Sequence, residues 1–321
     1  MKLLVLICRI LVGVTFVFSG FVKLVDPLGS AYKFQEYFGA DVLNLEFLIP
    51  YALPFSILLI IAEFMLGLML LVGYLPKLTA WSLMVMILVF LFLTWYSAYY
   101  DKVTDCGCFG DAVKLSTWGT FYKNVVLVIL IAVIVWQWKL ILPIKSFATA
   151  QWVSFAGFVF CLYITYYVLM HLPIIDFRPY AVGKNLPAGM EYIGDEEPPI
   201  HDFFLETVDG EDYTFKTLEE EKVMWVVAYN LDISDEQGFV QMKLITDEAI
   251  EKGYQVYFLS SSMEEDFEAI KTRFGLNMEL LFGDSTTLKT IIRANPGIVT
   301  LEKGTVTGKW NWTDTEKIQL K

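Results

Sequence analysis

Two cysteines separated by one glycine lie in a short polar stretch, DCGCFGD, at Asp105–Asp111. Glycine tolerates the backbone angles that a disulfide between Cys106 and Cys108 would require. Such a bond would be strained, and a strained disulfide is more oxidising and more easily reduced than a structural one. The spacing therefore favours a redox pair that passes oxidising equivalents to another thiol.

Other interpretations of Cys106 and Cys108 stay open. The acids of this stretch raise the pKa of nearby thiols and so disfavour the reactive thiolate, as expected for inert thiols of a structural loop. Two thiolates are also half of a structural zinc site. The chain has only two histidines, His171 and His201, and no second closely spaced cysteine pair. We therefore expect no metal site, and His171 is only a weak catalytic candidate.

The other two cysteines, Cys8 and Cys161, lie inside strongly apolar runs. A buried thiol in such surroundings behaves as a small hydrophobic side chain. We expect both to be inert.

One acidic side chain, Glu63, lies deep in an apolar run. An ionisable group at membrane depth is costly and by default indicates function. Glu63 is a candidate proton carrier, or a ligand for the polar head of a quinone-like molecule. The alternative is a neutral carboxylic acid that is hydrogen-bonded to a neighbouring helix, for instance through Ser82 or Tyr96.

Five apolar runs must position these residues, and each is close to the roughly 20 residues that a membrane-spanning helix needs. The runs are residues 3–22, 52–74, 78–99, 120–142 and 152–172. They predict an α-helical membrane bundle over residues 1–172, with the lipid bilayer as its surroundings.

The orientation of the bundle rests on weak evidence. The loops on its two sides carry equal numbers of Lys and Arg, which are the residues that orient membrane proteins. All seven loop acids of this half fall on one side. We therefore place the N-terminus in the cytoplasm, and five spans then put the DCGCFGD stretch and the C-terminal half on the outer face.

A loop between the first two spans, residues 23–50, contains VDPLGSAYKFQEYFG. Its Asp-Pro pair is a helix start signal, and apolar and charged residues alternate after it. We predict a short amphipathic helix in the outer interface.

The two halves differ in charge. Residues 1–172 hold ten basic and eight acidic residues, whereas residues 173–321 hold fourteen and twenty-eight. An acidic second half does not suit nucleic acid, whose phosphates attract a basic surface.

The second half begins with a Pro- and Gly-rich segment, residues 173–199, which we predict to be a linker. Residues 200–321 then alternate strand and helix patterns. A hairpin about Asp209-Gly210 comes first, and a hairpin about Lys303-Gly304 comes last. Buried strands and helices alternate between them, so we expect an α/β domain with a mixed sheet.

The opening FVFSGFVKLVDPLGSAYKFQEYF resembles the DoxX family of small four-helix bacterial membrane proteins, and DCGCFGDAVKLSTWGTFYKNVVL resembles the related MauE group. Together these resemblances cover residues 1–142 and leave the fifth span as an addition. They imply a bacterial cytoplasmic membrane protein that supports disulfide formation in a periplasmic partner. The group is also similar in architecture to vitamin K epoxide reductase, which implies a membrane quinone as electron acceptor.

Residues 200–310 resemble thioredoxin-like domains of the TlpA and peroxiredoxin kind. The resemblance implies that Pro296 is the cis-proline that faces the redox centre of such domains. The family's Cys-x-x-Cys would fall near residues 230–238, where this chain reads NLDISDEQG without a cysteine. Dithiol exchange is thereby excluded for this domain, and we expect it to bind an extended client beside Pro296.

These observations predict a membrane protein that supports thiol–disulfide chemistry in an extracytoplasmic client through Cys106 and Cys108. The alternative is a non-enzymatic scaffold or assembly factor, whose thioredoxin-like domain binds a partner and whose CGC loop is structural.

Overall fold

The computed structural model describes residues 1–102, 110–113, 115–192, 194 and 197–321. It divides into two compact units, Met1–Leu169 and Met170–Lys321, which are described separately below. Cys106 and Cys108 lie outside the described residues.

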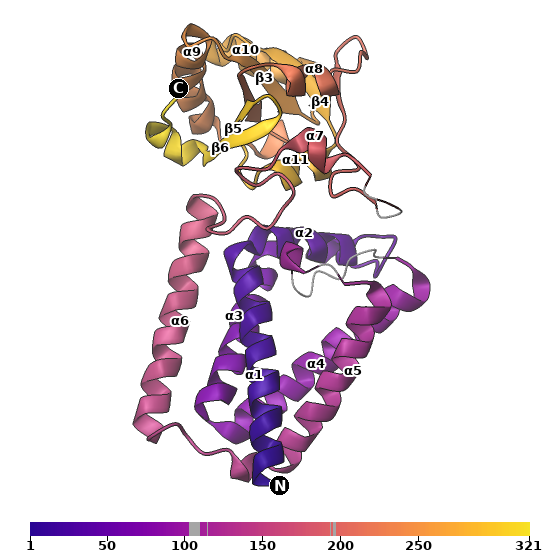
Figure 1. Cartoon of the computed structure of the whole chain (residues 1–321), viewed down its shortest axis with the longest axis vertical. Coiled ribbons are helices and arrows are strands. Elements are labelled where there is room, and N and C mark those ends of the chain that lie inside the picture. Colours follow the sequence, from indigo (N-terminus) through magenta and orange to yellow (C-terminus); the bar gives the residue numbers. More distant parts are fainter. Residues whose placement is uncertain (103–109, 114, 193, 195–196) are drawn as a thin grey trace. The chain divides into compact units, whose positions relative to one another are not determined.

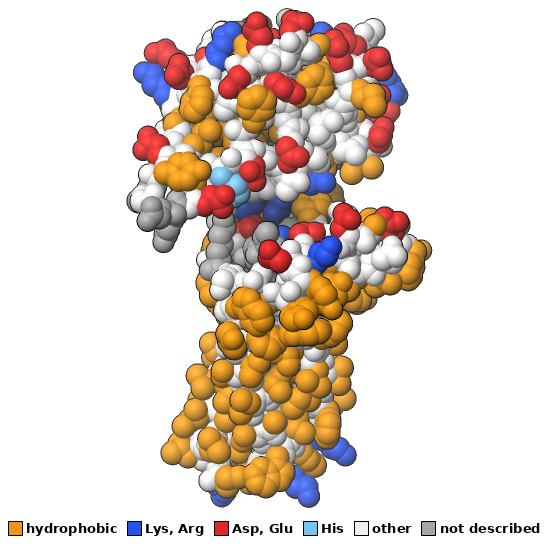
Figure 2. Space-filling model, turned by 90° about the vertical axis from the view of Figure 1, so that its right-hand side faces the viewer, with side chains coloured by type: hydrophobic (Ala, Val, Ile, Leu, Met, Phe, Trp, Pro, Cys, Tyr) orange, Lys and Arg blue, Asp and Glu red, His pale blue; other side chains and the backbone are white. Residues whose placement is uncertain are grey.

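In the first unit, five described helices are long and apolar enough to span a membrane, which confirms the five predicted spans. They are α1 (Lys2–Val25), α3 (Ala52–Val72), α4 (Pro76–Tyr100), α5 (Thr117–Trp136) and α6 (Phe147–Met170). On the face seen in Figure 2, hydrophobic side chains predominate over the long helices of this unit. Leu3, Leu58 and Trp152 are each about 70% exposed, as expected for side chains that contact lipid.

The predicted amphipathic helix is present as α2 (Pro27–Phe38) and runs across the ends of the long helices (Figure 1). The Asp26 carboxylate caps it by accepting a hydrogen bond from the Gly29 amide at 3.0 Å. Ser56 donates to the Pro27 carbonyl, and Tyr37 and Ser97 are hydrogen-bonded at 3.0 Å. These contacts attach the two ends of α2 to α3 and α4. A 3₁₀ helix, η1 (Glu46–Tyr51), leads into α3.

Helices α1 and α3 approach closely because three glycines lie between them. A Cβ atom at Gly20 would lie 2.7 Å from the Phe64 amide nitrogen, and one at Gly67 would lie 2.8 Å from that of Val17. A Cβ at Gly13 would lie 2.5 Å from atoms of the Leu71 side chain. Small residues of this kind permit tight helix packing where lipid provides no hydrophobic driving force.

Arg9 of α1 binds backbone carbonyls of two other segments. Its guanidinium donates to the carbonyls of Leu70 and Leu71 at 2.8 Å and of Leu142 at 3.0 Å. The last carbonyls of a helix have no partner within the helix. Arg9 therefore caps the C-terminal end of α3 and attaches the segment that precedes α6.

Helix α6 lies beside α1 and α3 and away from α5 (Figure 1). Cys161, Ile164 and Val168 of α6 form one buried cluster with Leu24, Ile60 and Phe64. The additional fifth span therefore packs against the other helices through its own apolar core.

The second unit contains a mixed six-stranded sheet, as predicted for an α/β domain. Its strands are β1 (Leu205–Thr207), β2 (Val223–Val227), β3 (Gln255–Ser260), β4 (Glu279–Gly283), β5 (Gly297–Glu302) and β6 (Thr305–Asn311). Their order is β1-β4-β3-β2-β5-β6. β2, β3 and β4 are parallel, whereas β1, β5 and β6 pair antiparallel with their neighbours.

Helices cover both faces of this sheet. One face packs against α7 (Leu186–Gly189), α8 (Thr214–Glu219) and α11 (Ser285–Ile291), and the other against α9 (Glu236–Glu251) and α10 (Glu264–Phe274). Successive β2 residues alternate between the two faces: Trp225 lies in the first core and Val226 in the second. A strand buried on both sides is apolar throughout, as VMWVV is.

Both predicted hairpin turns are present. β5 and β6 form the hairpin about Lys303-Gly304. At Asp209-Gly210 the chain also turns back on itself: the Thr207 amide donates to the Glu211 carbonyl, the Tyr213 amide donates to the Leu205 carbonyl, and Glu206 and Asp212 form an antiparallel bridge. This hairpin is short, because the Asp212 carboxylate accepts a hydrogen bond from the Thr214 amide at 2.9 Å and α8 begins at Thr214.

Residues 173–199, predicted as a linker, contribute to the core of the second unit. Tyr180 and Leu186 are 4% and 0% exposed. The Asp176 carboxylate accepts hydrogen bonds from Arg178 Nε and Lys309 Nζ, both at 2.7 Å, and Arg178 also donates to the Thr290 carbonyl. These buried contacts attach the segment to β6 and α11.

Candidate functional site

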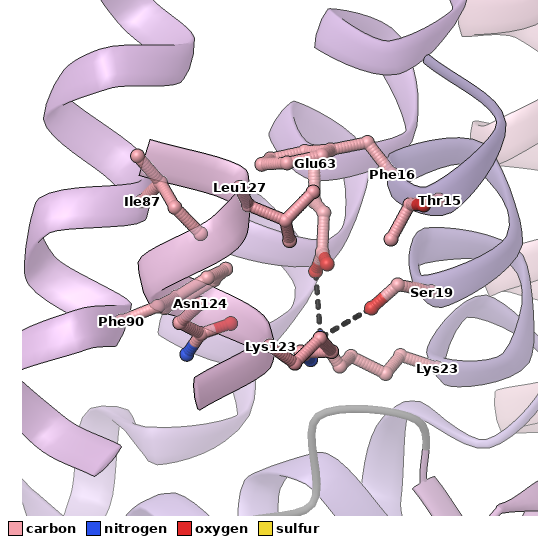
Figure 3. Close-up of a pocket in the computed structure, with 10 residues that line it drawn as sticks. All are labelled: Thr15, Phe16, Ser19, Lys23, Glu63, Ile87, Phe90, Lys123, Asn124 and Leu127. Carbon is pink, nitrogen blue, oxygen red and sulfur yellow. Dashed lines mark hydrogen bonds and ion pairs between the residues drawn. The ribbon is translucent and has the colours of Figure 1, made fainter. Parts of the chain in front are cut away.

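The first unit holds a buried ion pair between two helices. Lys23 Nζ of α1 lies 2.7 Å from a carboxylate oxygen of Glu63 of α3 and donates to the Ser19 hydroxyl at 3.2 Å (Figure 3). The two charged residues are 8% and 3% exposed. Glu63 is therefore paired with a cation, whereas the alternative raised from the sequence was a neutral acid bonded to a neighbouring helix, for instance through Ser82 or Tyr96. Tyr96 instead donates to the carbonyl of Val42.

A small pocket lies beside this pair, between α1, α3, α4 and α5. Its volume is about 10 Å³. Figure 3 shows Lys123 and Asn124 of α5 opposite Thr15 and Ser19 of α1. The rest of the pocket is lined by the apolar side chains of Phe16, Ile87, Phe90 and Leu127. The Asn124 amide donates to the Thr94 hydroxyl at 3.2 Å, which joins α5 to α4.

Sequence reasoning missed Lys23 because it assigned this residue to a loop. Helix α1 continues to Val25, and Asp26 then caps α2. The signal was present in the sequence, since Ser19 and Lys23 are four residues apart and therefore share one helix face. Thr15 lies four residues earlier on the same face and also lines the pocket.

The residues that flank the cysteine stretch are described, although Cys106 and Cys108 are not. Asp101 follows the end of α4 in a left-handed conformation, with φ of 49°. Gly110 begins a 3₁₀ turn, η2 (Gly110–Ala112), and a Cβ atom placed on it would lie 3.2 Å from Val22 Cγ1. Gly110 therefore lies against α1, at the residue that precedes Lys23.

Cys8 and Cys161 are buried, at 1% and 0% exposure, in two separate apolar clusters. Neither is in a disulfide. This burial agrees with the expectation that both are inert.

His171, at the start of the second unit, is hydrogen-bonded through Nδ1 to both carboxylate oxygens of Asp314, at 2.8 and 2.9 Å. Its carbonyl accepts from Asn311. Among the residues that the structure describes, no three His, Cys, Asp or Glu side chains gather as metal ligands would.

The peptide bond before Pro296 is cis. The segment after β2 lies beside this peptide bond. The side-chain amide of Asn295 donates to the backbone carbonyl of Asn230 at 2.8 Å, and the backbone amide of Asp235 donates to the backbone carbonyl of Asn295. Pro296 is nevertheless buried. A Cβ at Gly238 would lie 2.7 Å from Pro296 Cγ, so α9 packs directly on this proline, and the same Cβ would lie 3.0 Å from Trp312.

Comparison with known proteins gives one match. Residues 1–137 match the family model described as methylamine utilisation protein MauE. The match covers α1 to α5 and excludes α6 and the second unit. No curated protein and no solved structure matches the chain.

Proposed function

We propose that this multi-pass membrane protein supports thiol–disulfide chemistry in an extracytoplasmic protein, with Cys106 and Cys108 as the reactive pair. The proposal is carried by the burial of the other thiols. Cys8 and Cys161 are enclosed in separate apolar clusters, and residues 170–321 contain no cysteine. Thiol exchange with a partner therefore falls to the DCGCFGD stretch.

The match of residues 1–137 to the MauE family supports a membrane location for the unit that carries this pair. The placement of the loop acids supports a cytoplasmic N-terminus. The two sides carry equal numbers of Lys and Arg, but all seven loop acids of residues 1–172 fall on the side opposite the N-terminus. The cysteine pair and the second unit then face outward from a bacterial cytoplasmic membrane, where disulfides persist.

The proposed exchange follows ordinary thiol chemistry. A partner thiolate attacks one sulfur of the Cys106–Cys108 disulfide, and a mixed disulfide forms as the other sulfur leaves. A second partner thiolate resolves this intermediate. The partner is oxidised by two electrons, and the cysteine pair becomes a dithiol. Its reoxidation would deliver two electrons and two protons to a membrane quinone, which becomes the quinol.

The first prediction concerns the oxidation state of this pair. Trapping of thiols with a mass-tagged alkylating reagent in intact cells should show Cys106 and Cys108 in both oxidised and reduced forms. Cys106→Ser and Cys108→Ser should each abolish the oxidised form and lower the disulfide content of the partner. Cys8→Ser and Cys161→Ser are matched controls and should change neither.

A pair that stays fully reduced in cells, together with unchanged partner disulfides in both serine variants, would contradict the proposal. That result would favour the alternative of a non-enzymatic membrane scaffold. The alkylating reagent also tests the orientation, because a membrane-impermeant reagent should label the reduced pair only if the stretch faces outward.

A further inference from the structure

The Lys23–Glu63 ion pair is not explained by folding. Both side chains are almost fully buried within helices that can span a membrane. Removal of two charges from water often costs as much as their attraction returns, and apolar residues of similar volume frequently stabilise a protein at least as well. Ionisable groups within membrane spans typically mark places where an ion or a proton moves.

The cavity beside this pair is suited to water. Its volume of about 10 Å³ is near the minimum that holds one water molecule. A buried water also needs polar partners, and Ser19 and Asn124 line the cavity together with the ion pair. A proton carried with one water molecule therefore fits this site.

The polar groups extend from the interior of the bundle to its end. Thr15, Ser19 and Lys23 follow one another at intervals of four residues on one face of α1. Lys23 is two residues from the end of α1, whereas Glu63 lies at the middle of α3. The Lys23 side chain thus links the buried carboxylate to the end of the bundle that α2 crosses.

We infer that Glu63 is a proton-exchange site that is reached from the α2 end of the bundle. A proton enters through the cavity water and Lys23 and binds a carboxylate oxygen of Glu63. The ion pair then becomes a hydrogen bond from an ammonium to a carboxylic acid, and the site gains one positive charge. Release of the proton from Glu63 reverses this step, and no electron is transferred. The inference is independent of the thiol chemistry proposed above.

Among the described residues that line the cavity, the charged groups other than Glu63 come from two helices. Lys23 of α1 pairs with it, and Lys123 of α5 lines the same cavity. Glu63 is the only charged residue of α3, and α4 has no charged residue beyond Lys77 in its first turn. Helix α6 has no charged residue. On α2, Lys33 and Glu36 pair with each other at 2.9 Å.

The test uses the full chain in lipid nanodiscs and infrared difference spectra recorded as a function of pH. The wild-type chain should show a C=O band of a protonated carboxyl group that grows as the pH falls and is missing in Glu63→Gln. Lys23→Met removes the side chain that links Glu63 to the end of the bundle and should change the band relative to the wild type. Lys33→Met removes a partly exposed cation of α2 and should leave the band unchanged.

A band that persists unchanged in Glu63→Gln, or a wild-type chain without a Glu63 band at any pH, would overturn the inference. Glu63→Gln leaves Lys23 buried without its counter-ion, which can impair folding. The double variant Lys23→Met/Glu63→Leu removes both charges and supplies a second reference without the band. It should fold and show no loss of thermal stability. A double variant that does not fold assigns the pair to folding and overturns the inference as well.

Discussion

Asp176→Asn is expected to lower the free energy of unfolding of the second unit by about 3–5 kcal/mol, the usual cost of removing one partner from a buried ion pair. The Asp176 carboxylate lies 2.7 Å from both Arg178 Nε and Lys309 Nζ, and the side chains of these two bases are 3% and 4% exposed. Asparagine keeps the shape but removes the charge, so two buried cations lose their counter-ion.

Urea unfolding of the full chain in detergent, followed by near-ultraviolet circular dichroism, measures this loss. Asp247→Asn is the matched control, because Asp247 pairs with Lys243 on the surface and is 48% exposed. It should change the unfolding free energy by less than about 0.5 kcal/mol. Equal effects of Asp176→Asn and Asp247→Asn would show that the ion pairs of Asp176 with Arg178 and Lys309 do not attach residues 173–199 to the sheet.

The effect of Asp176 should also depend on pH. Burial disfavours the charged carboxylate, but attraction and hydrogen bonds from Arg178 and Lys309 outweigh it, so the pKa of Asp176 is lowered from its ordinary value of 3.8. A carboxylate with a lowered folded-state pKa contributes stability above its unfolded pKa and loses it as the pH falls through the folded value. The difference in urea midpoint between wild type and Asp176→Asn should therefore be constant near neutral pH and shrink below about pH 3.8.

Gly67→Ala is expected to destabilise the first unit by about 1–3 kcal/mol, as overpacking does in a tight interior. In an isolated helix this substitution would be favourable. Here the added Cβ would lie 2.8 Å from the Val17 amide nitrogen and 2.9 Å from Phe16 Cβ, so α1 and α3 must separate. Gly20→Ala should act similarly, because its Cβ would meet the backbone of Phe64.

Thermal unfolding in lipid nanodiscs measures this effect, and Gly157→Ala is the matched control. Gly157 also lies within a spanning helix, but the three nearest atoms to its added Cβ all belong to the side chains of Leu68 and Met65. A side chain can rotate where backbone cannot, so the control should lose less stability. If the variants at positions 67 and 157 lose the same stability, close backbone approach does not determine the α1–α3 packing.

The elements were largely predictable from local patterns. The five spans follow from long apolar runs because no other secondary structure within one segment satisfies its backbone in lipid. Helix α2 followed from Asp26-Pro27, and the two hairpin turns followed from Asp209-Gly210 and Lys303-Gly304. The buried contacts of residues 173–199 were not predictable in this way. The Asp176 carboxylate pairs with Lys309, which lies 133 residues further along the chain.

The candidate functional residues show the same difference between what local sequence and what tertiary packing determine. The sequence by itself determined which groups could react: the thiols of Cys106 and Cys108 and the carboxylate of Glu63 within an apolar run. Only the tertiary structure decided what surrounds Glu63. Lys23 is forty residues away in sequence, and the pair meets because glycines let α1 approach α3. Pro296 shows the same limit, since the sequence suggested a cis-proline and only the tertiary structure shows that it is buried beside Gly238 of α9. Local chemistry is a property of residue types, whereas burial and pairing depend on which distant segments pack together.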